Sequence, residues 1–173
     1  MVLGGCPSEN LFVVNNIEVP NINHFGTQGS SSGSLSFINL DFVEDVSFSS
    51  GGFGARYGDK MSSVLSLNTS LGRTDRIGGK ALISATQFGL NVEGPVGDFG
   101  NFIFSARESY LDLIFKAAGL PFVPVYTDFN LIFNSKLPNN DHIHILVLGA
   151  LDRIDRDYST EENKVVNAGI LEN

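Results

Sequence analysis

The stretch that decides the fold reads Gly51-Gly52-Phe53-Gly54-Ala55-Arg56-Tyr57-Gly58. Four of its eight residues are glycines. Glycine reaches backbone angles that other residues avoid, and it lets a neighbouring element approach closely. We therefore expect a structural turn here, with unusual backbone angles or a close contact. The segment also loosely matches a dinucleotide-binding glycine pattern, but that pattern requires alternating strands and helices, whereas alternating strands follow.

Apolar runs on both sides of this turn predict strands. Before it, Leu11–Val14 and Ile17–Val19 enclose Asn15-Asn16, a pair that tolerates positive φ angles, which predicts a hairpin with a two-residue turn. The segment Asn21–Ser36, rich in Asn, Gly and Ser, is expected to be an ordered loop. Two further segments are a short turn leading into a strand at Phe37–Phe48 and a strand at Val64–Asn68.

From about Gly78 onward, apolar and polar residues alternate in short runs, as in strands with one apolar and one polar face. The connections alternate in length: Pro95–Gly100 and Pro138–Asp141 are short, whereas Tyr110–Pro124 and the acidic stretch from Arg153 are long. The alternating runs are Phe88–Glu93, Asn101–Arg107 and Asp128–Asn134, and Gly79–Ala85 and His142–Asp152 are further expected strands.

The longer internal connection has its own helical spacing. Apolar residues recur at i, i+3, i+4 and i+7, which predicts one amphipathic helix that ends at Gly119 and Pro121. These residues are Leu111, Ile114, Phe115 and Ala118.

Composition restricts the function. The 11 Lys and Arg residues against 19 Asp and Glu residues give a net charge of -8, which disfavours nucleic acid as a partner. Nineteen Gly and 14 Phe residues without any Trp favour β structure. The single Cys6 excludes an internal disulfide and a multi-cysteine metal site. The longest apolar stretch, Ile145–Leu151, is far shorter than a membrane-spanning helix, so any membrane crossing would use strands.

The alternation itself has two structural explanations. In an outer-membrane β-barrel, apolar side chains face lipid and polar ones face the lumen, with short turns at one end and longer loops at the other. In a soluble β-sandwich, one face of each sheet is buried and the other is hydrated. The Phe-rich apolar face slightly favours the barrel, and periodicity alone leaves both explanations open.

The ordered motifs of the first ~70 residues resemble the later plug domain of TonB-dependent outer-membrane receptors, of the kind common in Bacteroidota. Two departures are Gly54, where proline is common, and Asn16, where glycine is common. The matching segments are Gly4–Asn10 with the Phe12–Val19 hairpin, Asn39–Val46, the signature Gly51–Gly58, and Ser62–Leu67, followed by Val92–Pro95 and Ser105–Asp112, which resemble an early barrel strand and its exit into an outer loop.

The resemblance implies a mainly β fold. Residues 1–75 would be the C-terminal part of an α+β plug domain, and residues 76–173 about the first five antiparallel strands of a transmembrane β-barrel. Because such transporters close a barrel of about 22 strands around the plug, we expect the chain to be an internal fragment with an incomplete barrel. The implied function is uptake of an external ligand, energised through TonB, at the cell outer membrane. The implied partners are the inner-membrane TonB complex, outer-membrane lipid, and a small-molecule, metal-chelate or oligosaccharide ligand such as a siderophore, cobalamin or a glycan.

Members of the family contact ligands through plug apices and outer loops, which here correspond to Asn21–Ser34 and Tyr110–Pro124. Arg56 and Glu93 are candidates for a charge contact between plug and barrel, because charges inside a polar lumen are usually paired. The candidate ligand contacts are His24, Phe25, Gln28 and Tyr110, and the plug signature turn comprises Gly51, Gly52, Arg56, Tyr57 and Gly58.

Catalysis and metal binding have little support in the sequence. His142 and His144 share one strand face, but two ligands seldom make a metal site, so we expect them to line the periplasmic end of the lumen. No arrangement of a nucleophile with a base, or of paired carboxylates, stands out, so neither an enzyme nor a cofactor is expected.

The alternative function is a secreted β-sandwich module for adhesion or carbohydrate binding. A third hypothesis, a nicotinamide-dependent enzyme, rests on Gly52 and Gly54 alone.

Overall fold

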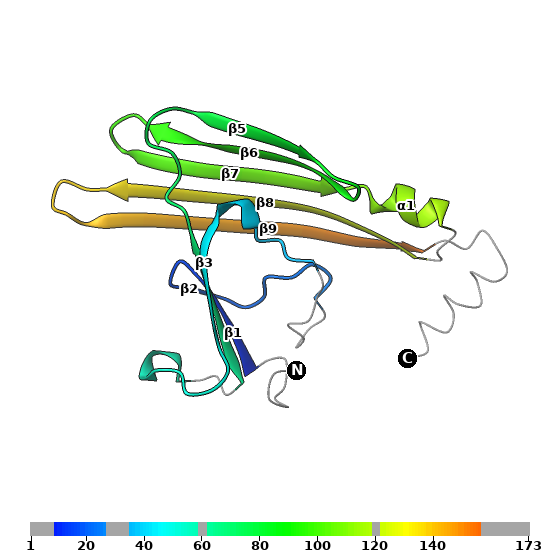
Figure 1. Cartoon of the computed structure of the whole chain (residues 1–173), viewed down its shortest axis with the longest axis horizontal. Helices are drawn as coiled ribbons and strands as arrows, with labels where there is room; N and C mark the ends of the chain where they lie inside the picture. The colour runs from blue at the N-terminus through cyan, green and yellow to red at the C-terminus, as the bar shows by residue number, and fades with distance from the viewer. Residues whose placement is uncertain (1–8, 27–34, 59–61, 119–121, 157–173) are drawn as a thin grey trace. The chain divides into compact units, whose positions relative to one another are not determined.

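The computed structural model of the chain describes residues 9–26, 35–58, 62–118 and 122–156. The protein is mainly β and contains two separate sheets (Figure 1). Its contacts divide it into two compact units, Met1–Gly72 and Arg73–Asn173. This division lies three residues before the boundary after residue 75 that the sequence indicated.

The first unit holds a four-stranded sheet in the order β2-β1-β4-β3. The central strands β1 and β4 run parallel, and the other two pairs are antiparallel. Its elements are β1 (Asn10–Val14), β2 (Ile17–Val19), the 3-10 turn η2 (Leu40–Phe42), β3 (Val43–Ser49), the 3-10 turn η3 (Ala55–Tyr57) and β4 (Ser63–Thr69).

The β1–β2 hairpin forms as the sequence predicted. Val14 pairs with Ile17, and between them Asn15 and Asn16 have φ of 49° and 66°. Asparagine is one of the few residues that adopt this left-handed region readily, and two such residues in succession match the twist of a hairpin. The expectation of a two-residue turn with positive φ angles is therefore confirmed.

The β1 strand is apolar on both faces because both faces are covered. Leu11, Phe12, Val13 and Val14 are all buried. A strand buried on both sides loses the alternating pattern of a strand with one hydrated face. The connection from β2 to β3, where we expected an ordered loop, has its two ends joined by the antiparallel bridge between Asn23 and Ser36.

The second unit is an antiparallel meander in the order β5-β6-β7-β8-β9 (Figure 1). Each strand pairs antiparallel with the strands next to it in the sequence. The sequence predicted about five antiparallel strands here, and the structure has five. The elements are β5 (Gly78–Ile83), β6 (Gln87–Val96), β7 (Gly100–Ser109), the helix α1 (Leu111–Ala117), β8 (Phe122–Lys136) and β9 (His142–Arg156). The helix predicted from the spacing of apolar residues is thus confirmed.

Several strands are longer than the sequence indicated, and three of them extend into segments expected to be connections. β8 begins at Phe122, inside the expected loop Tyr110–Pro124, and β9 continues to Arg156, past the expected end at Asp152. β6 likewise runs through Pro95 to Val96. Backbone pairing between strands does not depend on side-chain polarity, so the ladders continue past the alternating runs.

Both prolines inside strands lie where their strand has one neighbour only. Pro95 follows the last β5–β6 pair, at Glu93, and pairs with Asn101 of β7. Pro124 precedes the first β7–β8 pair, at Thr127, and faces β9 alone. Proline lacks the N–H that a central strand position uses, so positions with one open side tolerate it.

Candidate functional site

The glycine turn of the first unit has the unusual backbone that its sequence predicts. Gly51 and Gly52 have φ of 85° and 65°, a region that strongly favours glycine. Gly54 is extended, with φ of -61°. No described atom lies within 4 Å of the place that a Cβ would take at Gly52 or Gly54. Unusual angles are therefore confirmed at the first two glycines, whereas close approach does not explain Gly52 or Gly54.

The aromatic residues of the turn cover one face of the first sheet. Phe53 and Tyr57 pack against the buried cluster of Leu11, Val13 and Val64, which belongs to β1 and β4. The glycines at the start of the turn let the chain reverse direction, and the two rings then seal the apolar side chains beneath them. The signature turn thus has a structural role in this sheet.

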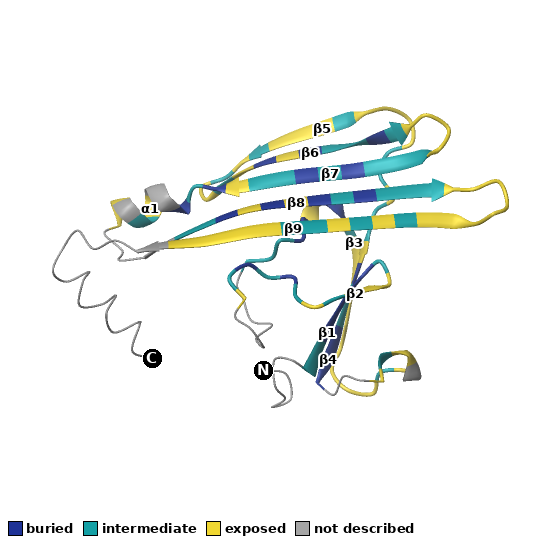
Figure 2. Ribbon diagram, turned by 180° about the vertical axis from the view of Figure 1, so that it is seen from behind, coloured by how far each residue is buried: buried dark blue, intermediate teal, exposed yellow. Residues whose placement is uncertain are grey.

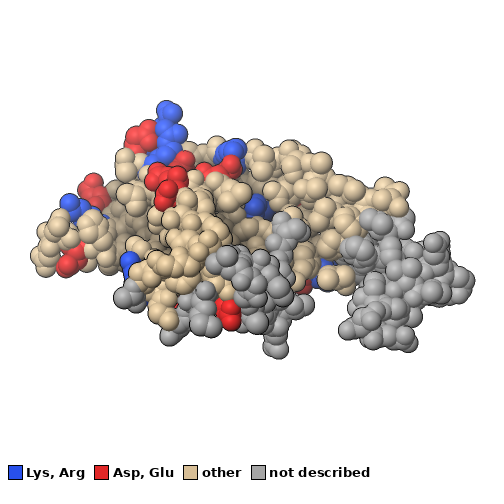
Figure 3. Space-filling model, turned by 60° about the horizontal axis from the view of Figure 1, so that its bottom comes forward, with Lys and Arg blue, Asp and Glu red and all other residues tan. Residues whose placement is uncertain are grey.

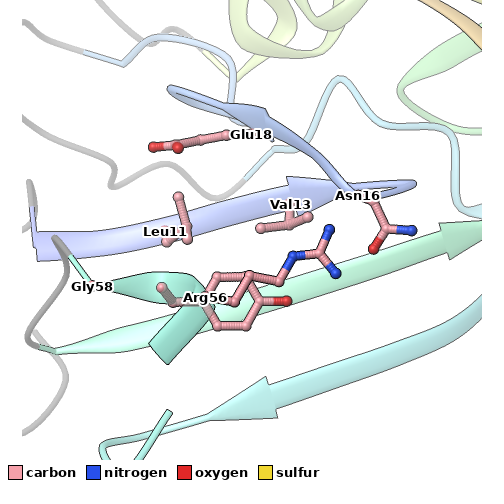
Figure 4. A pocket seen from close by; sticks show the side chains of 7 residues that line it. Leu11, Val13, Asn16, Glu18, Arg56 and Gly58 are labelled. Carbon is pink, nitrogen blue, oxygen red and sulfur yellow. The ribbon is translucent and has the colours of Figure 1, made fainter. Parts of the chain in front are cut away.

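A pocket of about 150 Å³ opens beside this turn (Figure 4). The guanidinium carbon of Arg56 lies 6.0 Å from the centre of the Tyr57 ring, within the range of a cation–π contact. Among the described residues, no carboxylate forms an ion pair with Arg56. The residues that line the pocket are Leu11, Val13, Asn16, Glu18, Arg56, Tyr57 and Gly58.

Two of the candidate ligand contacts on the first unit lie among the described residues. His24 is only 1% exposed, and its ring meets Phe37 edge-on at 5.9 Å and Phe25 at 6.1 Å. The imidazole therefore packs inside this unit and presents little surface to a ligand. Phe25 is half-buried and has φ of 57°, and its ligand contact stays a prediction. Gln28 lies outside the described residues.

Tyr110 joins two connections at one end of the second sheet. Its hydroxyl donates a hydrogen bond to the carbonyl of Ser84, and its backbone N–H donates to the carbonyl of Thr86 at 3.0 Å. Both acceptors belong to the short β5–β6 turn, and Tyr110 precedes α1. This tyrosine fixes the start of the long connection against the short one, while its contact with a ligand stays a prediction.

The strand register assigns the side chains of the second sheet to two faces of opposite character. Residues directly opposite each other in antiparallel strands share a face. What we call the apolar face holds Ala81 and Ile83 of β5, Phe88, Leu90 and Val92 of β6, Phe102, Phe104 and Ala106 of β7, Phe129, Leu131 and Phe133 of β8, and Ile143, Ile145, Val147 and Leu151 of β9.

The opposite side, which we call the polar face, is the better buried of the two. Along β7 and β8, buried residues alternate with less buried ones (Figure 2). Ser105, Asp128 and Asn130 are buried there, together with the apolar Ile103 and Ile132. On the apolar face, by contrast, many large side chains are exposed. The polar residues of this face are Gln87, Asn91 and Glu93 of β6, Asn101, Ser105, Arg107 and Ser109 of β7, Tyr126, Asp128, Asn130 and Asn134 of β8, and His142, His144 and Asp152 of β9, and Leu146 and Leu148 of β9 lie on the same face.

An ion pair is buried on the polar face. Arg107 of β7 donates from Nε to the Asp128 carboxylate of β8 at 2.9 Å, with side-chain exposures of 11% and 0%. Sequence reasoning missed this pair. The alternation of β7 and β8 places each residue on a polar face, but only the register shows that the two residues lie opposite each other.

Further hydrogen bonds on the polar face join residues of different strands. The Tyr126 hydroxyl donates to Gln87 Oε1 at 2.7 Å, and the Tyr126 backbone N–H donates to Ser109 Oγ at 2.8 Å. These bonds link β8 to β6 and to β7. Buried polar groups need such partners, since a buried donor or acceptor without one is costly.

The remaining candidates are each placed within their own unit. Arg56 belongs to the first unit and Glu93 to the polar face of β6 in the second, so their charge contact stays a prediction. His142 and His144 do share the polar face, and His144 Nδ1 is hydrogen-bonded to Asn134 Oδ1. In the ranges that the structure covers, no group of three or more His, Cys, Asp or Glu residues is arranged to hold a metal ion.

The segment that enters the second sheet carries an exposed charge cluster. Arg73 donates to both carboxylate oxygens of Asp75 at 3.0 Å, and Arg76 lies 3.6 Å from the same carboxylate. The hydrogen bond from Arg73 holds the pKa of the Asp75 carboxyl below its usual value. On the face drawn in Figure 3, charged side chains gather in a few groups separated by uncharged surface.

Comparison of the chain with known protein families, with curated proteins and with solved structures finds no match. Among the described residues, no helix has the length and apolar character needed to cross a membrane.

Proposed function

We propose that the protein is part of a TonB-dependent outer-membrane receptor, with the second sheet in the barrel wall and the first unit in the plug. The observation that carries this proposal is the polarity of the second sheet. Large apolar side chains on one face are exposed, whereas serine, asparagine and an ion pair are buried on the other. A barrel wall in lipid has this arrangement, with apolar side chains outward and polar ones towards the lumen.

The height of the apolar face agrees with a bilayer. On β9 it extends from Ile143 to Leu151, eight residues apart. At ~3.4 Å per residue this is ~27 Å along the strand, and a tilt of ~40° reduces it to ~21 Å. The apolar band of outer-membrane barrels is ~25 Å high.

The lengths of strands and connections support the same proposal. β8 and β9 have 15 residues each, whereas strands of globular proteins usually have about 3–10. Outer-membrane barrels have short turns on one side and longer loops on the other. At the α1 end, β8 and β9 continue past the last β7–β8 pair at Thr127. The β5–β6 turn at this end is short, so long loops are not the rule at every connection.

A secreted β-sandwich is the alternative, and the exposure of the apolar face counts against it. A sandwich buries the apolar face of each sheet against a second sheet. Here Ile145 is 46% exposed, Val147 is 41% exposed and Leu151 is 71% exposed. In water such a continuous apolar surface promotes aggregation, whereas in lipid it is the stable arrangement.

The plug assignment of the first unit rests on the resemblance of its ordered motifs, above all Gly51–Gly58. The function that follows is import of an external ligand energised through TonB, at the cell outer membrane. In this proposal the first unit blocks the lumen, and the ligand binds on its outer side. The buried ion pair of Arg107 and Asp128 would lie on the wall of that lumen.

Spin labels on β9 test the proposal in the protein expressed from its complete gene, with Cys6 replaced by serine. Ile145→Cys and Val147→Cys place labels on the apolar face. Leu146→Cys and Leu148→Cys are matched controls on the polar face of the same strand. Collisions with oxygen, which dissolves in lipid, and with a water-soluble nickel chelate are then compared in isolated membranes.

We expect the labels at 145 and 147 to collide with oxygen far more often than with the nickel chelate, and the two controls to lack this preference. Labels at 145 and 147 that are shielded from both reagents, in a protein that stays soluble without detergent, would indicate the β-sandwich instead and overturn the proposal.

A further inference from the structure

The pocket beside the glycine turn has a chemical character that the proposed function does not use. It lies wholly within the first unit, between η3 and the β1–β2 hairpin. Its existence therefore does not depend on whether the second sheet spans a membrane.

The two ends of the pocket carry opposite charges. In Figure 4 the guanidinium of Arg56 points towards the end that Asn16 borders, and the carboxylate of Glu18 points towards the other end. A guanidinium beside an amide offers several N–H donors to an anion, and a carboxylate accepts from an ammonium group.

Between the charged ends, the wall of the pocket is apolar. Leu11 and Val13 present their side chains from the same face of β1, and the Tyr57 ring lies beside them. Alternate residues of a strand are ~7 Å apart, so this wall is about as long as a chain of four or five methylene groups. A cavity of about 150 Å³ is large enough for a group the size of benzene.

We propose that this pocket binds a small zwitterion. The carboxylate of the ligand lies against Arg56 and Asn16, its ammonium group lies against Glu18, and a short methylene chain covers Leu11 and Val13. Glu18 also has contacts within the protein, and the ammonium group of the ligand binds its carboxylate in addition to them. Because the charged side chains are exposed, each ion pair contributes little, and weak binding is expected.

The test titrates the full chain, labelled with 15N in detergent micelles, with 5-aminopentanoate. The matched probes pentanoate and pentylamine each lack one of the two charged groups. The backbone amide signals of Val13, Asn16 and Tyr57 report binding, because these residues line the pocket. We expect saturable shifts of these signals with 5-aminopentanoate, and weaker binding of the two other probes.

Two variants and a control locate the charges. Arg56→Gln and Glu18→Gln should each weaken binding of 5-aminopentanoate about fivefold, the upper range for an exposed ion pair. Arg76→Gln removes an exposed arginine outside the pocket and should leave binding unchanged. Both pocket residues are exposed, so their replacement should leave the amide spectrum otherwise folded.

Three results would overturn the proposal: shifts that never saturate, pentanoate binding as tightly as 5-aminopentanoate, or Arg56→Gln behaving like Arg76→Gln. None of them affects the membrane proposal, which is tested on β9.

Discussion

Arg107 and Asp128 lie directly opposite each other on β7 and β8, and their 2.9 Å ion pair leaves the carboxylate fully buried. Removing one partner of a buried pair leaves an uncompensated charge, so Asp128→Ala should lower the free energy of unfolding by about 3–5 kcal/mol. Urea unfolding of the protein in detergent micelles measures this loss.

The control for this prediction is Asp75→Asn, which removes the carboxylate of an exposed ion pair and should change the stability little. The double variant Arg107→Met/Asp128→Leu should recover most of the stability, because it removes both charges and keeps the volume. A double variant as unstable as Asp128→Ala would show that the loss comes from packing.

Phe129 and Gly149 are a second pair that constrains the sheet. They face each other on β8 and β9, and a Cβ at Gly149 would lie 2.2 Å from the Phe129 ring. Gly149→Ala must displace the partly exposed Phe129 ring, so a loss of about 0.5–1.5 kcal/mol is expected, the cost of an off-rotamer side chain. Gly79→Ala is the control on the same face, since its Cβ would meet only the Asn91 carbonyl at 3.6 Å. Equal unfolding midpoints for the two variants would contradict the prediction.

Asn15 holds the end of β4 through its side chain. Its Nδ2 donates to Thr69 Oγ1 at 2.7 Å, and its Oδ1 accepts from the Thr69 backbone N–H at 2.8 Å. Asn15→Ala loses both bonds and places alanine at positive φ, so a loss of about 2 kcal/mol is expected from thermal or urea unfolding. Asn16→Gly is the control and should not destabilise, because glycine suits its φ of 66°.

The exposed pair of Arg73 and Asp75 predicts a pH dependence. The hydrogen bond from Arg73 lowers the pKa of the Asp75 carboxyl. A carboxyl whose pKa is lower in the folded state contributes stability above its unfolded pKa, and this contribution is lost as the pH falls through the folded pKa.

An NMR titration of the Asp75 carboxyl carbon measures this pKa directly. Arg73→Gln should raise the Asp75 pKa towards its usual value, and Arg76→Gln should raise it less, because Arg76 lies farther away at 3.6 Å. An Asp75 pKa that does not move in Arg73→Gln would disprove this cause.

Local chemistry decided which parts of the fold could be predicted. Asn15-Asn16 defines its turn without outside help, and the apolar spacing from Leu111 defines α1, so both were predicted and both are confirmed. The ends of β8 and β9 could not be predicted from the sequence. The partner strand supplies the backbone pairing there, and Pro124 suggested that β8 begins only after it.

Features that depend on distant parts of the chain lay beyond sequence reasoning. The burial of His24 follows from rings such as Phe37, 13 residues away, which no local pattern indicates. The pairing of Arg107 with Asp128 requires the register across a connection that contains α1. The pocket residues come from a hairpin and from a turn about 40 residues later, so their grouping also required the structure.

The parallel pairing of β1 with β4 determines the order in which the chain can fold. Asn10 must meet Ser63, 53 residues later, so completing the first sheet requires a large loop closure. The second sheet needs only neighbouring strands, and it can grow one hairpin at a time. Until β4 pairs with β1, the β1–β2 hairpin therefore stands alone, and an isolated two-stranded hairpin is marginally stable at best in water.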